Sequence, residues 1–258
     1  MAGKHALIGH TGFVGGNLKA QSQFTHLYNT SNIADIDGES FDLIVSSATP
    51  AEMWRANQDP AADMASIQAL MDHLATVTAK QFVLISTIST YAHPVGVDEN
   101  SDLQTTAATP YGVHRAQLEA FCRERFANVL VVRLPGLYGN GLKKNIIFDF
   151  LHDNNTDKID SRAVYQFYNL DRIWADIQVA LANQLSLVNF ATAPTSVAEV
   201  AEAAFGRVFN QTTLDPDKLP YFDMHTKHAK LYGQTGNYLE TKDQVLAGIK
   251  AFVDRERA

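Results

Sequence analysis

A tyrosine and an arginine stand four positions apart in "TPYGVHRAQLEAF", residues 109–121. Side chains at this spacing share one face of a helix, so Tyr111 and Arg115 are expected to lie together. A phenol with a pKa of about 10 is a poor base at neutral pH, and a fixed positive charge beside it favours the phenolate. The two residues therefore have the chemistry of a proton-transfer group and its electrostatic partner. The same spacing also occurs in ordinary surface pairs, so the surrounding sequence must decide.

Hydroxyl side chains gather in "VLISTISTYAHP", residues 83–94, where a short apolar run ends. The apolar run predicts a buried strand, which places the hydroxyls at its carboxyl end. Thr87 lies at this strand end, and Ser86 and Ser89 are neighbours whose role the sequence leaves open. A strand end rich in Ser and Thr also occurs in purely structural settings.

A glycine turn, "GHTGFVGG" (residues 9–16), follows the first apolar run and opens the first helical pattern. Gly9 and Gly12 would permit a tight turn and let backbone amides approach a pyrophosphate, and Gly15 would let the helix pack closely against the strand. The helix N-terminus adds partial positive charge. Since the turn lies between a strand and a helix, it predicts dinucleotide binding. The alternative is a tight glycine turn that binds no ligand.

Short apolar runs alternate with helical patterns through the first half of the chain. The runs predict strands and the patterns predict helices, with strands at 5–9, 25–29, 41–48, 81–87 and 128–136 and helices at 14–22, 59–77 and from 109 onward. This alternation is typical of a parallel sheet covered by helices on both faces. In the less regular second half we expect helices at 143–153, 171–183, 196–206 and 241–257 and a strand at 186–192, all in a smaller lobe.

The composition excludes several classes of function. A net charge of -7 gives no basic face for nucleic acid, and no apolar run approaches the roughly 20 residues of a membrane helix. The single cysteine, Cys122, cannot form an internal disulfide and is expected to be a buried structural thiol. His225 and His228 have no third ligand partner, so no metal site is expected. The amino terminus has no signal pattern, and we expect a soluble cytoplasmic protein.

The glycine turn, the hydroxyls before Tyr91 and the Tyr111–Arg115 helix together resemble the extended short-chain dehydrogenase/reductase superfamily, specifically the NAD-dependent epimerase/dehydratase family. The resemblance covers residues 3–145 well and the remainder loosely. It implies a Rossmann-type α/β fold with a doubly wound parallel sheet. We expect a single domain over residues 1–258, in which the chain from about residue 140 contributes a small C-terminal substrate-binding lobe.

The resemblance also implies catalytic roles. In the family a tyrosine exchanges a proton with a substrate hydroxyl or carbonyl, a cation binds the nicotinamide ribose and lowers the tyrosine pKa, and a Ser or Thr orients the substrate oxygen. The matching residues are Tyr111, Arg115 and Thr87, the last lying four positions before Tyr91. Arg115 departs from the family's lysine, and the adjacent His114 is expected to be an exposed helical histidine. Arginine can supply charge and donate to ribose hydroxyls, but it cannot readily give up a proton.

The expected cofactor is NAD or NADP. The family commonly has an acidic residue for the ribose hydroxyls where this chain has Asn29, and an uncharged residue would not repel a 2′-phosphate, which slightly favours NADP. These positions could equally be simple turn formers. The residues expected to bind the cofactor are Gly9, Thr11, Gly12, Phe13, Val14, Gly15, Asn29, Thr30, Ser31, Ala48, Thr49, Tyr111, Arg115, Pro135, Gly136 and Leu137.

The substrate is expected to be a small carbohydrate-like molecule, contacted by Thr87, Asn145, Tyr165 and Arg172. Tyr165 stands where relatives often carry an arginine for the substrate diphosphate, which weakens a nucleotide-sugar assignment. We expect an NAD(P)-dependent oxidoreductase, epimerase or dehydratase that acts by hydride transfer. The alternative is a non-catalytic NAD(P)-binding sensor or scaffold. The resemblance also implies a homodimer formed through the helices near residues 60–77 and 110–127.

Overall fold

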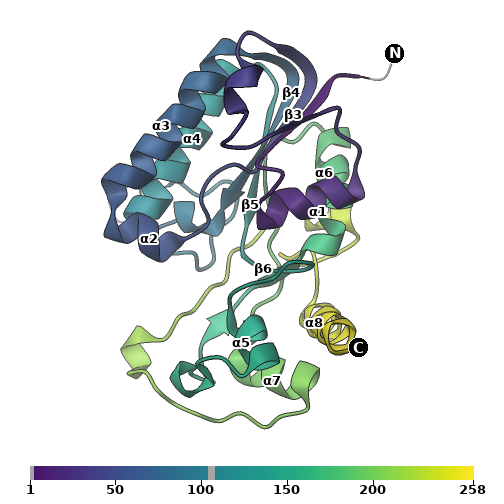
Figure 1. Ribbon diagram of the computed structural model, residues 1–258. Helices are drawn as coiled ribbons and strands as arrows, with labels where there is room; N and C mark the ends of the chain where they lie inside the picture. The colour runs from purple at the N-terminus through teal and green to yellow at the C-terminus, as the bar shows by residue number, and fades with distance from the viewer. Residues whose placement is uncertain (1–2, 104–107) are drawn as a thin grey trace. The chain divides into compact units, whose positions relative to one another are not determined.

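The computed structural model describes residues 3–103 and 108–258, which form two compact units (Figure 1). The first unit comprises the chain up to His93, with Asn100–Arg133 and Ile173–Val188. The second comprises Pro94–Glu99, Leu134–Arg172 and Asn189–Ala258. Within the described ranges, no helix is both long enough and apolar enough to cross a membrane.

A six-stranded sheet organises the first unit, with strand order β2-β1-β3-β4-β5-β9. Strand β1 pairs in parallel with β2 and β3, and β3 pairs in parallel with β4. The strands are β1 (His5–Ile8), β2 (His26–Tyr28), β3 (Ser40–Ser46), β4 (Thr78–Thr87), β5 (Val129–Leu134) and β9 (Leu187–Asn189). The Rossmann-type parallel-sheet fold expected from the sequence is confirmed.

Helices cover both faces of this sheet. Helices α3 and α4 pack together on one face, whereas α1 and α6 pack together on the other (Figure 1). The helices of the first unit are α1 (Phe13–Gln21), α2 (Met53–Gln58), α3 (Pro60–Thr76), α4 (Pro110–Arg125) and α6 (Ile173–Ala182). The sequence did not predict the short helix α2.

Local signals start the two long helices of this unit at the positions that the sequence predicts. The Asp59 carboxylate caps α3 by accepting the Ala62 N–H at 3.0 Å. The Thr109 hydroxyl caps α4, and a proline takes the first helical position in both cases. A capping side chain satisfies an N–H that has no partner within the helix, and proline at this position loses no hydrogen bond.

The second unit contains two small sheets and three helices. Strands β6 and β8 pair in parallel, and β7 and β10 pair antiparallel. Its elements are β6 (Gly136–Tyr138), α5 (Ile146–His152), β7 (Val164–Tyr165), β8 (Phe167–Asn169), β10 (Thr195–Ser196), α7 (Val197–Phe205) and α8 (Lys242–Arg257). Ser196 and Thr241 form capping boxes, and Gly206 ends α7 with a φ of 61°. These caps confirm the predicted ends of both helices.

Two elements of the second half of the chain belong to the first unit. The sequence assigned the helix at 171–183 and the strand at 186–192 to the C-terminal lobe. The structure instead packs α6 against α1 and adds β9 to the sheet beside β5. Apolar periodicity predicts a helix or strand but does not specify which sheet it joins, because that depends on contacts distant in sequence.

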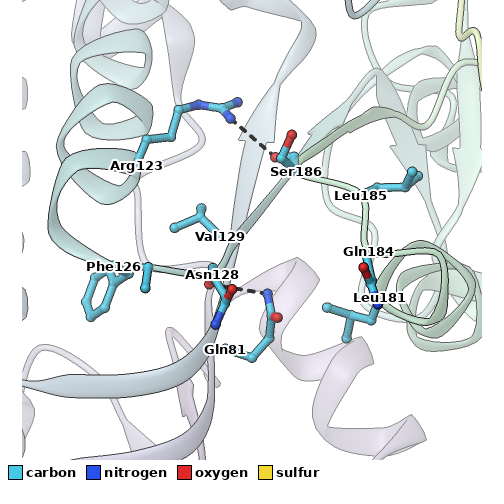
Figure 2. Close-up of a pocket in the computed structure, with 10 residues that line it drawn as sticks. Gln81, Arg123, Phe126, Asn128, Val129, Leu181, Gln184, Leu185 and Ser186 are labelled. Atoms are coloured by element: carbon cyan, nitrogen blue, oxygen red, sulfur yellow. Dashed lines mark hydrogen bonds between the residues drawn. The ribbon is translucent and has the colours of Figure 1, made fainter.

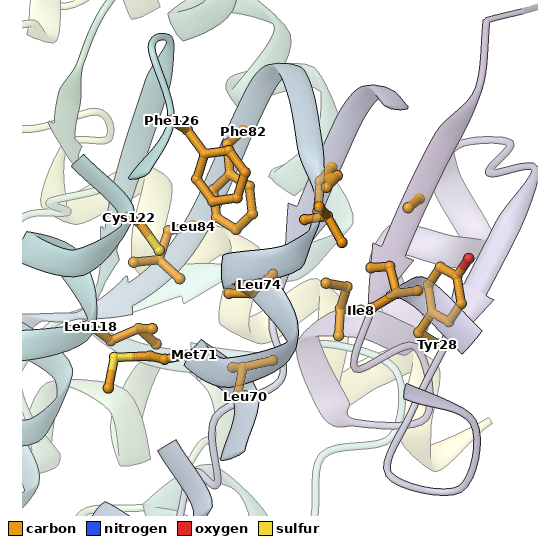
Figure 3. Close-up of a cluster of buried hydrophobic side chains, with 14 of the residues drawn as sticks. Ile8, Tyr28, Leu70, Met71, Leu74, Phe82, Leu84, Leu118, Cys122 and Phe126 are labelled. Atoms are coloured by element: carbon orange, nitrogen blue, oxygen red, sulfur yellow. The ribbon is translucent and has the colours of Figure 1, made fainter. Parts of the chain in front are cut away.

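The main core fills the space between the sheet and helices α3 and α4. Phe82 of β4 stacks on Phe126, which follows α4, with ring centroids 4.3 Å apart (Figure 3). Leu74 and Cys122 lie in the same cluster, and both are fully buried. Burial raises the pKa of the Cys122 thiol to about 12, so it stays protonated at neutral pH. The structure thus supports the expectation of a structural cysteine.

The stacked phenylalanines generate a stability prediction. Replacing Phe82 with alanine should lower the free energy of unfolding by about 3–5 kcal/mol, because it removes a fully buried ring and leaves a cavity. Urea denaturation followed by circular dichroism would measure this loss. The control is Gln117→Ala, at an exposed position of α4, which should change stability by less than about 0.5 kcal/mol. Similar small losses for both variants would contradict the assignment of this core.

Candidate active site

The carboxyl ends of three central strands meet at one edge of the sheet. Ile8 of β1 pairs with Ser46 of β3, and Ser46 pairs with Leu84 of β4. The glycine turn after β1 and the Thr87 hydroxyl at the end of β4 therefore reach the same edge. In open α/β sheets, ligands bind outside the carboxyl ends of the strands.

The glycine turn leaves no room for side chains at two of its positions. Gly9 has a φ of 85°, and a Cβ there would lie 2.7 Å from the Ser47 carbonyl oxygen. A Cβ on Gly15 would lie 2.1 Å from the Gly9 oxygen. Gly12 begins α1, which has no side-chain cap on its first turn. An uncapped helix N-terminus behind a backbone-lined turn fits the pyrophosphate of a dinucleotide.

Uncharged polar groups surround the end of β2. The Asn29 side-chain oxygen accepts hydrogen bonds from the Ser31 N–H at 2.8 Å and from its hydroxyl at 2.6 Å. The Asn29 amide nitrogen lies 3.4 Å from Nε2 of His10. Thr30 is exposed beside them. Sequence reasoning missed His10, although its place within the glycine turn is a signal for a cofactor contact.

The remaining predicted cofactor residues of this unit lie at the same edge. Thr11, Phe13 and Val14 lie in the glycine turn and the first turn of α1, and Ala48 and Thr49 follow β3. All five have at least part of their surface accessible to solvent. Their roles in cofactor binding stay predictions.

Close backbone packing positions Tyr111 beside Thr87. Gly112 lies against the short 3₁₀ helix that follows β4, where a Cβ would meet the Ser89 oxygen at 2.0 Å. The Tyr111 N–H donates to Oδ1 of Asn57 on α2 at 3.1 Å. The start of α4 is thereby held against the end of β4, and the Tyr111 phenol lies near the Thr87 side chain, which lowers its pKa. The structure thus brings together all three predicted catalytic residues, since Arg115 lies over the Tyr111 ring.

The surroundings of Tyr111 favour its protonated form. Burial has the largest effect and raises the phenol pKa above its ordinary value of 10. The Arg115 charge and the hydrogen bond with Thr87 lower the pKa, whereas the Asp63 carboxylate raises it again. Because burial and Asp63 outweigh the lowering effects, the phenol carries its proton at neutral pH.

Arg115 lies across the face of the Tyr111 ring, with its guanidinium carbon 3.8 Å from the ring centroid. One terminal nitrogen donates to the Asp63 carboxylate, and the other donates to the Pro50 carbonyl oxygen at 2.6 Å. The residue is 2% exposed. The ribose contact expected of Arg115 stays a prediction. Its charge lowers the pKa of the Tyr111 phenol.

Asp63 contacts two side chains from α4. Besides Arg115, it contacts His114, whose Nδ1 lies 2.7 Å from Oδ2 of Asp63. The sequence favoured an exposed His114, which is wrong, since its side chain is only 12% exposed. Burial by itself would raise the Asp63 pKa, but the hydrogen bonds from Arg115 and His114 outweigh it and hold the pKa below its usual range.

Sequence reasoning missed Asp63, although the pattern of α3 contains a signal for it. Asp63 lies four residues before the buried Ile67 and continues the apolar stripe through Leu70 and Leu74. A carboxylate on the buried face of an amphipathic helix needs a partner, because a buried unpaired charge is costly. Such a residue is therefore a candidate for a structural or catalytic ion pair.

A second buried hydrogen-bond network joins the end of β4 to α4 and β5. The Ser86 hydroxyl donates to Glu119 of α4 at 2.5 Å. Arg133 of β5 donates two hydrogen bonds to the same carboxylate, at 3.0 and 2.6 Å, and its guanidinium carbon lies 4.7 Å from the Tyr91 ring centroid. Ser86, whose role the sequence left open, is thus a buried structural donor.

The predicted site residues of the second unit are engaged in local structure. The Asn145 side chain caps α5 by accepting from the Ile147 and Phe148 N–H groups, and it donates to the Leu137 carbonyl oxygen at 2.9 Å. Tyr165 stacks on Phe222. These contacts hold both side chains in place but do not test a role in substrate binding.

The other second-unit candidates are placed as follows. Arg172 pairs with Glu240 at 2.7 Å. Pro135 follows β5 directly, and Gly136 lies in β6. Across residues 3–103 and 108–258, no group of three or more His, Cys, Asp or Glu side chains is arranged to hold a metal ion. The contacts of these residues with substrate or cofactor stay predictions.

A family comparison places the chain among known enzymes. The family described as "NAD dependent epimerase/dehydratase family" matches residues 25–165, more than half of the chain. The chain belongs to this family. The match begins after the glycine turn and includes Thr87, Tyr111 and Arg115, and it confirms the resemblance drawn from the sequence. A search of curated proteins gave no significant match.

Several solved structures share the fold. UDP-glucose 4-epimerase of Thermotoga maritima, solved with UDP-glucose, is 16% identical with a TM-score of 0.72, and 98% of each chain is covered. The enzyme WbmG of Bordetella bronchiseptica, solved with NAD and UDP, is 17% identical with a TM-score of 0.73, covering 99% of this chain and 95% of that one. The dTDP-4-dehydrorhamnose reductase of Bacillus anthracis, solved with NADP, is 15% identical with a TM-score of 0.74. The match covers 97% of this chain and 98% of that one.

A pocket in this epimerase/dehydratase family member lies at the opposite edge of the sheet (Figure 2). It is lined near the start of β4 by Gln81, near the start of β5 by Val129, and by the connection between α6 and β9. Arg123 crosses it and donates to the Ser186 carbonyl oxygen at 3.3 Å. The pocket is therefore distinct from the edge that carries Thr87 and the glycine turn.

The buried Glu119–Arg133 pair generates a second stability prediction. Glu119→Leu should lower the free energy of unfolding by about 3–5 kcal/mol, because it leaves the Arg133 charge buried without its carboxylate. The double variant Glu119→Leu/Arg133→Met should recover most of this loss, since it buries no charge. Urea denaturation would measure both, with the exposed Glu124→Leu on the same helix as control. A single variant as stable as this control would show that the pair is not buried as described.

Proposed function

We propose that this family member is an NAD(P)-dependent oxidoreductase, epimerase or dehydratase that acts by hydride transfer on a carbohydrate-like substrate. The observation that carries the proposal is the Tyr111 phenol, which lies near the Thr87 side chain and is covered on one ring face by Arg115. This group lies in the same unit as a glycine turn that fits a pyrophosphate. Membership of the NAD-dependent epimerase/dehydratase family supports the same reaction class.

Proton transfer is the part of the reaction that this chain supplies. A bound nicotinamide dinucleotide would give or take the hydride. The protonated Tyr111 phenol would donate its proton to a substrate carbonyl oxygen, which the Thr87 hydroxyl would hold in place. In the reverse direction, the phenolate would accept the proton of a substrate hydroxyl. Since the Tyr111 pKa is raised, carbonyl reduction at neutral pH starts with the proton in place, whereas oxidation is favoured as pH rises.

Arg115 supports this chemistry through its charge alone. Its guanidinium faces the Tyr111 ring and stabilises negative charge that develops on the phenolate. It does not relay protons, because arginine stays protonated in proteins. We therefore propose an electrostatic role for Arg115 in place of the ribose contact that the family's lysine makes.

The choice of cofactor follows from the groups at the end of β2. Solved relatives of similar fold contain NAD in one case and NADP in another, so the family allows both. Here the Asn29 amide and the exposed Thr30 hydroxyl are donors, and neither residue presents a carboxylate to a 2′-phosphate. We propose a slight preference for NADP.

The substrate class follows from the relatives and from the second unit. UDP-glucose is present in one similar structure and UDP in another, which supports a sugar or a nucleotide sugar. Tyr165 stands at the position expected for a diphosphate-binding arginine, and Arg172 is paired with Glu240. A diphosphate would then need other cations, for which the exposed Lys143 and Lys144 are candidates.

We also propose that the protein forms a homodimer through α3 and α4. These helices pack side by side on one face of the sheet, and each keeps an exposed side. Static light scattering of the purified protein would give the mass of the assembly.

Replacing Tyr111 with phenylalanine tests the proposed reaction. Hydride transfer should fall by about 10²–10⁴-fold, because the phenol is the proton-transfer group, whereas NAD(P)H affinity should not change. Turnover on a panel of free sugars and nucleotide sugars, with fluorescence titration of NADH and NADPH, would measure both. The control is Tyr221→Phe at an exposed position.

Retained turnover in Tyr111→Phe would contradict the role of Tyr111. A wild-type protein that binds a dinucleotide but turns over nothing on the panel would favour the alternative of a non-catalytic sensor or scaffold. The buried Arg115, which departs from the family's lysine, gives that alternative its support. A wild-type protein that binds neither dinucleotide would contradict both.

Replacing Asn29 with aspartate tests the cofactor preference. The new carboxylate should lower NADPH affinity by about tenfold or more, because it repels the 2′-phosphate, and should leave NADH affinity unchanged or raised. Fluorescence titration gives both dissociation constants. Asn210→Asp makes the same charge change at an exposed position of the second unit and should alter neither. Equal loss of both affinities would contradict Asn29 as the residue next to the ribose.

A further inference from the structure

Asp63 is the acidic residue that meets the cation beside Tyr111. It lies on α3, is 7% exposed, and accepts hydrogen bonds from both Arg115 and His114 of α4. The Arg115 guanidinium therefore has a fixed place, between the Asp63 carboxylate, the Pro50 carbonyl and the Tyr111 ring. Neither the family comparison nor the sequence pattern assigns a role to Asp63.

Stability alone does not account for the buried Asp63–Arg115 ion pair. Burying two charges costs desolvation energy that their attraction repays only when all polar atoms find partners, and apolar residues of similar size often serve as well. Within the described chain, Nε of Arg115 is buried and has no hydrogen-bond partner. One buried N–H of this ion pair therefore has no acceptor, so the pair is not optimised for stability. Because it lies against Tyr111, we infer that it has a role at that tyrosine.

Arginine suits this arrangement better than lysine. Its planar fork donates in two directions at once, to Asp63 and to Pro50, which fixes its plane over the Tyr111 ring. A lysine ammonium is a compact charge on a flexible stem and offers no flat face to a ring. The replacement of the family's lysine by arginine and the presence of Asp63 are thus parts of one arrangement.

We propose that Asp63 is a positioning residue, whose carboxylate locks Arg115 across the Tyr111 ring and balances its charge. The proposal deepens the proposed function, and it rests on that function only for the claim that the Tyr111 proton is the one transferred. Asp63 acts by fixing Arg115 and also by its own charge, which raises the Tyr111 pKa, and it needs no contact with substrate.

The charges around Tyr111 determine whether each neighbouring group raises or lowers the pKa of its phenol. Asp63 on α3 raises the Tyr111 pKa, whereas Arg115 on α4 and the Thr87 hydroxyl at the end of β4 lower it. His114 on α4 faces Asp63. The charged residues of α2 and its N-cap, Arg55 and Glu52, are exposed and lie 3.7 Å from each other, and the 3₁₀ helix after β4, Ile88–Thr90, contributes only hydroxyls.

The test is a titration of the Tyr111 phenol without substrate or cofactor. Protein labelled with ¹³Cζ-tyrosine is followed by NMR from about pH 8 to about pH 12, and Tyr111→Phe identifies the signal. Asp63→Asn should lower the Tyr111 titration midpoint by about one pH unit, because Arg115 keeps its charge and loses the balancing carboxylate. Asp72→Asn, on an exposed position of the same helix, is the matched control and should leave the midpoint unchanged.

A midpoint that stays or rises in folded Asp63→Asn overturns the proposal, since a merely structural Asp63 would lower stability without lowering the midpoint. If Asp63→Asn does not fold, Arg115→Met is compared with Asp63→Asn/Arg115→Met, which buries no charge pair. The double variant should titrate at lower pH than the single one, and equal midpoints overturn the proposal.

This titration separates the failure of the positioning role from failure of the proposed function. If no substrate is turned over, the proposed function fails while the midpoint still reports on Asp63. If Tyr111→Phe abolishes turnover but the midpoint is unmoved in Asp63→Asn, only the positioning role fails.

Discussion

A buried positive charge at Arg115 constrains the whole carboxyl edge of the sheet. A guanidinium that is 2% exposed must find acceptors inside the protein, because leaving it unpaired there would be very costly. The acceptors come from separate segments, namely Asp63 of α3 and the Pro50 carbonyl between β3 and α2. The charge therefore ties these segments to α4, and the ring of Tyr111 is fixed as a consequence.

Helix α4 combines two kinds of burial along one face. Tyr111, Arg115 and Glu119 follow one another at four-residue intervals and carry the polar networks near the strand ends. Leu118 and Cys122 then continue the buried surface into the apolar core. The apolar half supplies stability, whereas the polar half places a phenol, a cation and a carboxylate where the sheet ends. The predicted catalytic pair, Tyr111 and Arg115, lies in the first turns of the helix.

The sequence predicted the features that depend on local signals. The N-caps Asp59 and Thr109 start α3 and α4 as expected, and the four-residue spacing of Tyr111 and Arg115 brought them together. The glycine turn also formed where its context required. Each of these depends on residues within one or two helical turns of each other.

Features that depend on distant contacts were not predictable in the same way. The partner of Arg115 lies 52 residues away, and the spacing within α4 says nothing about it. The same limit explains why α6 and β9 were assigned to the wrong unit and why His114 was expected at the surface. Asn145 differs, because its capping of α5 is a local interaction. Its positive φ and its hydrogen bond to the Leu137 carbonyl oxygen nevertheless could not be predicted from the sequence.

The central claim is that Arg115 serves the tyrosine and not the cofactor. A crystal structure of the protein with bound NADPH tests this most directly. The arrangement described here predicts that the guanidinium stays on Asp63 and over the Tyr111 ring when the dinucleotide is bound. An Arg115 side chain that has left Asp63 and donates to the nicotinamide ribose would contradict it, and would return this residue to the role of the family's lysine.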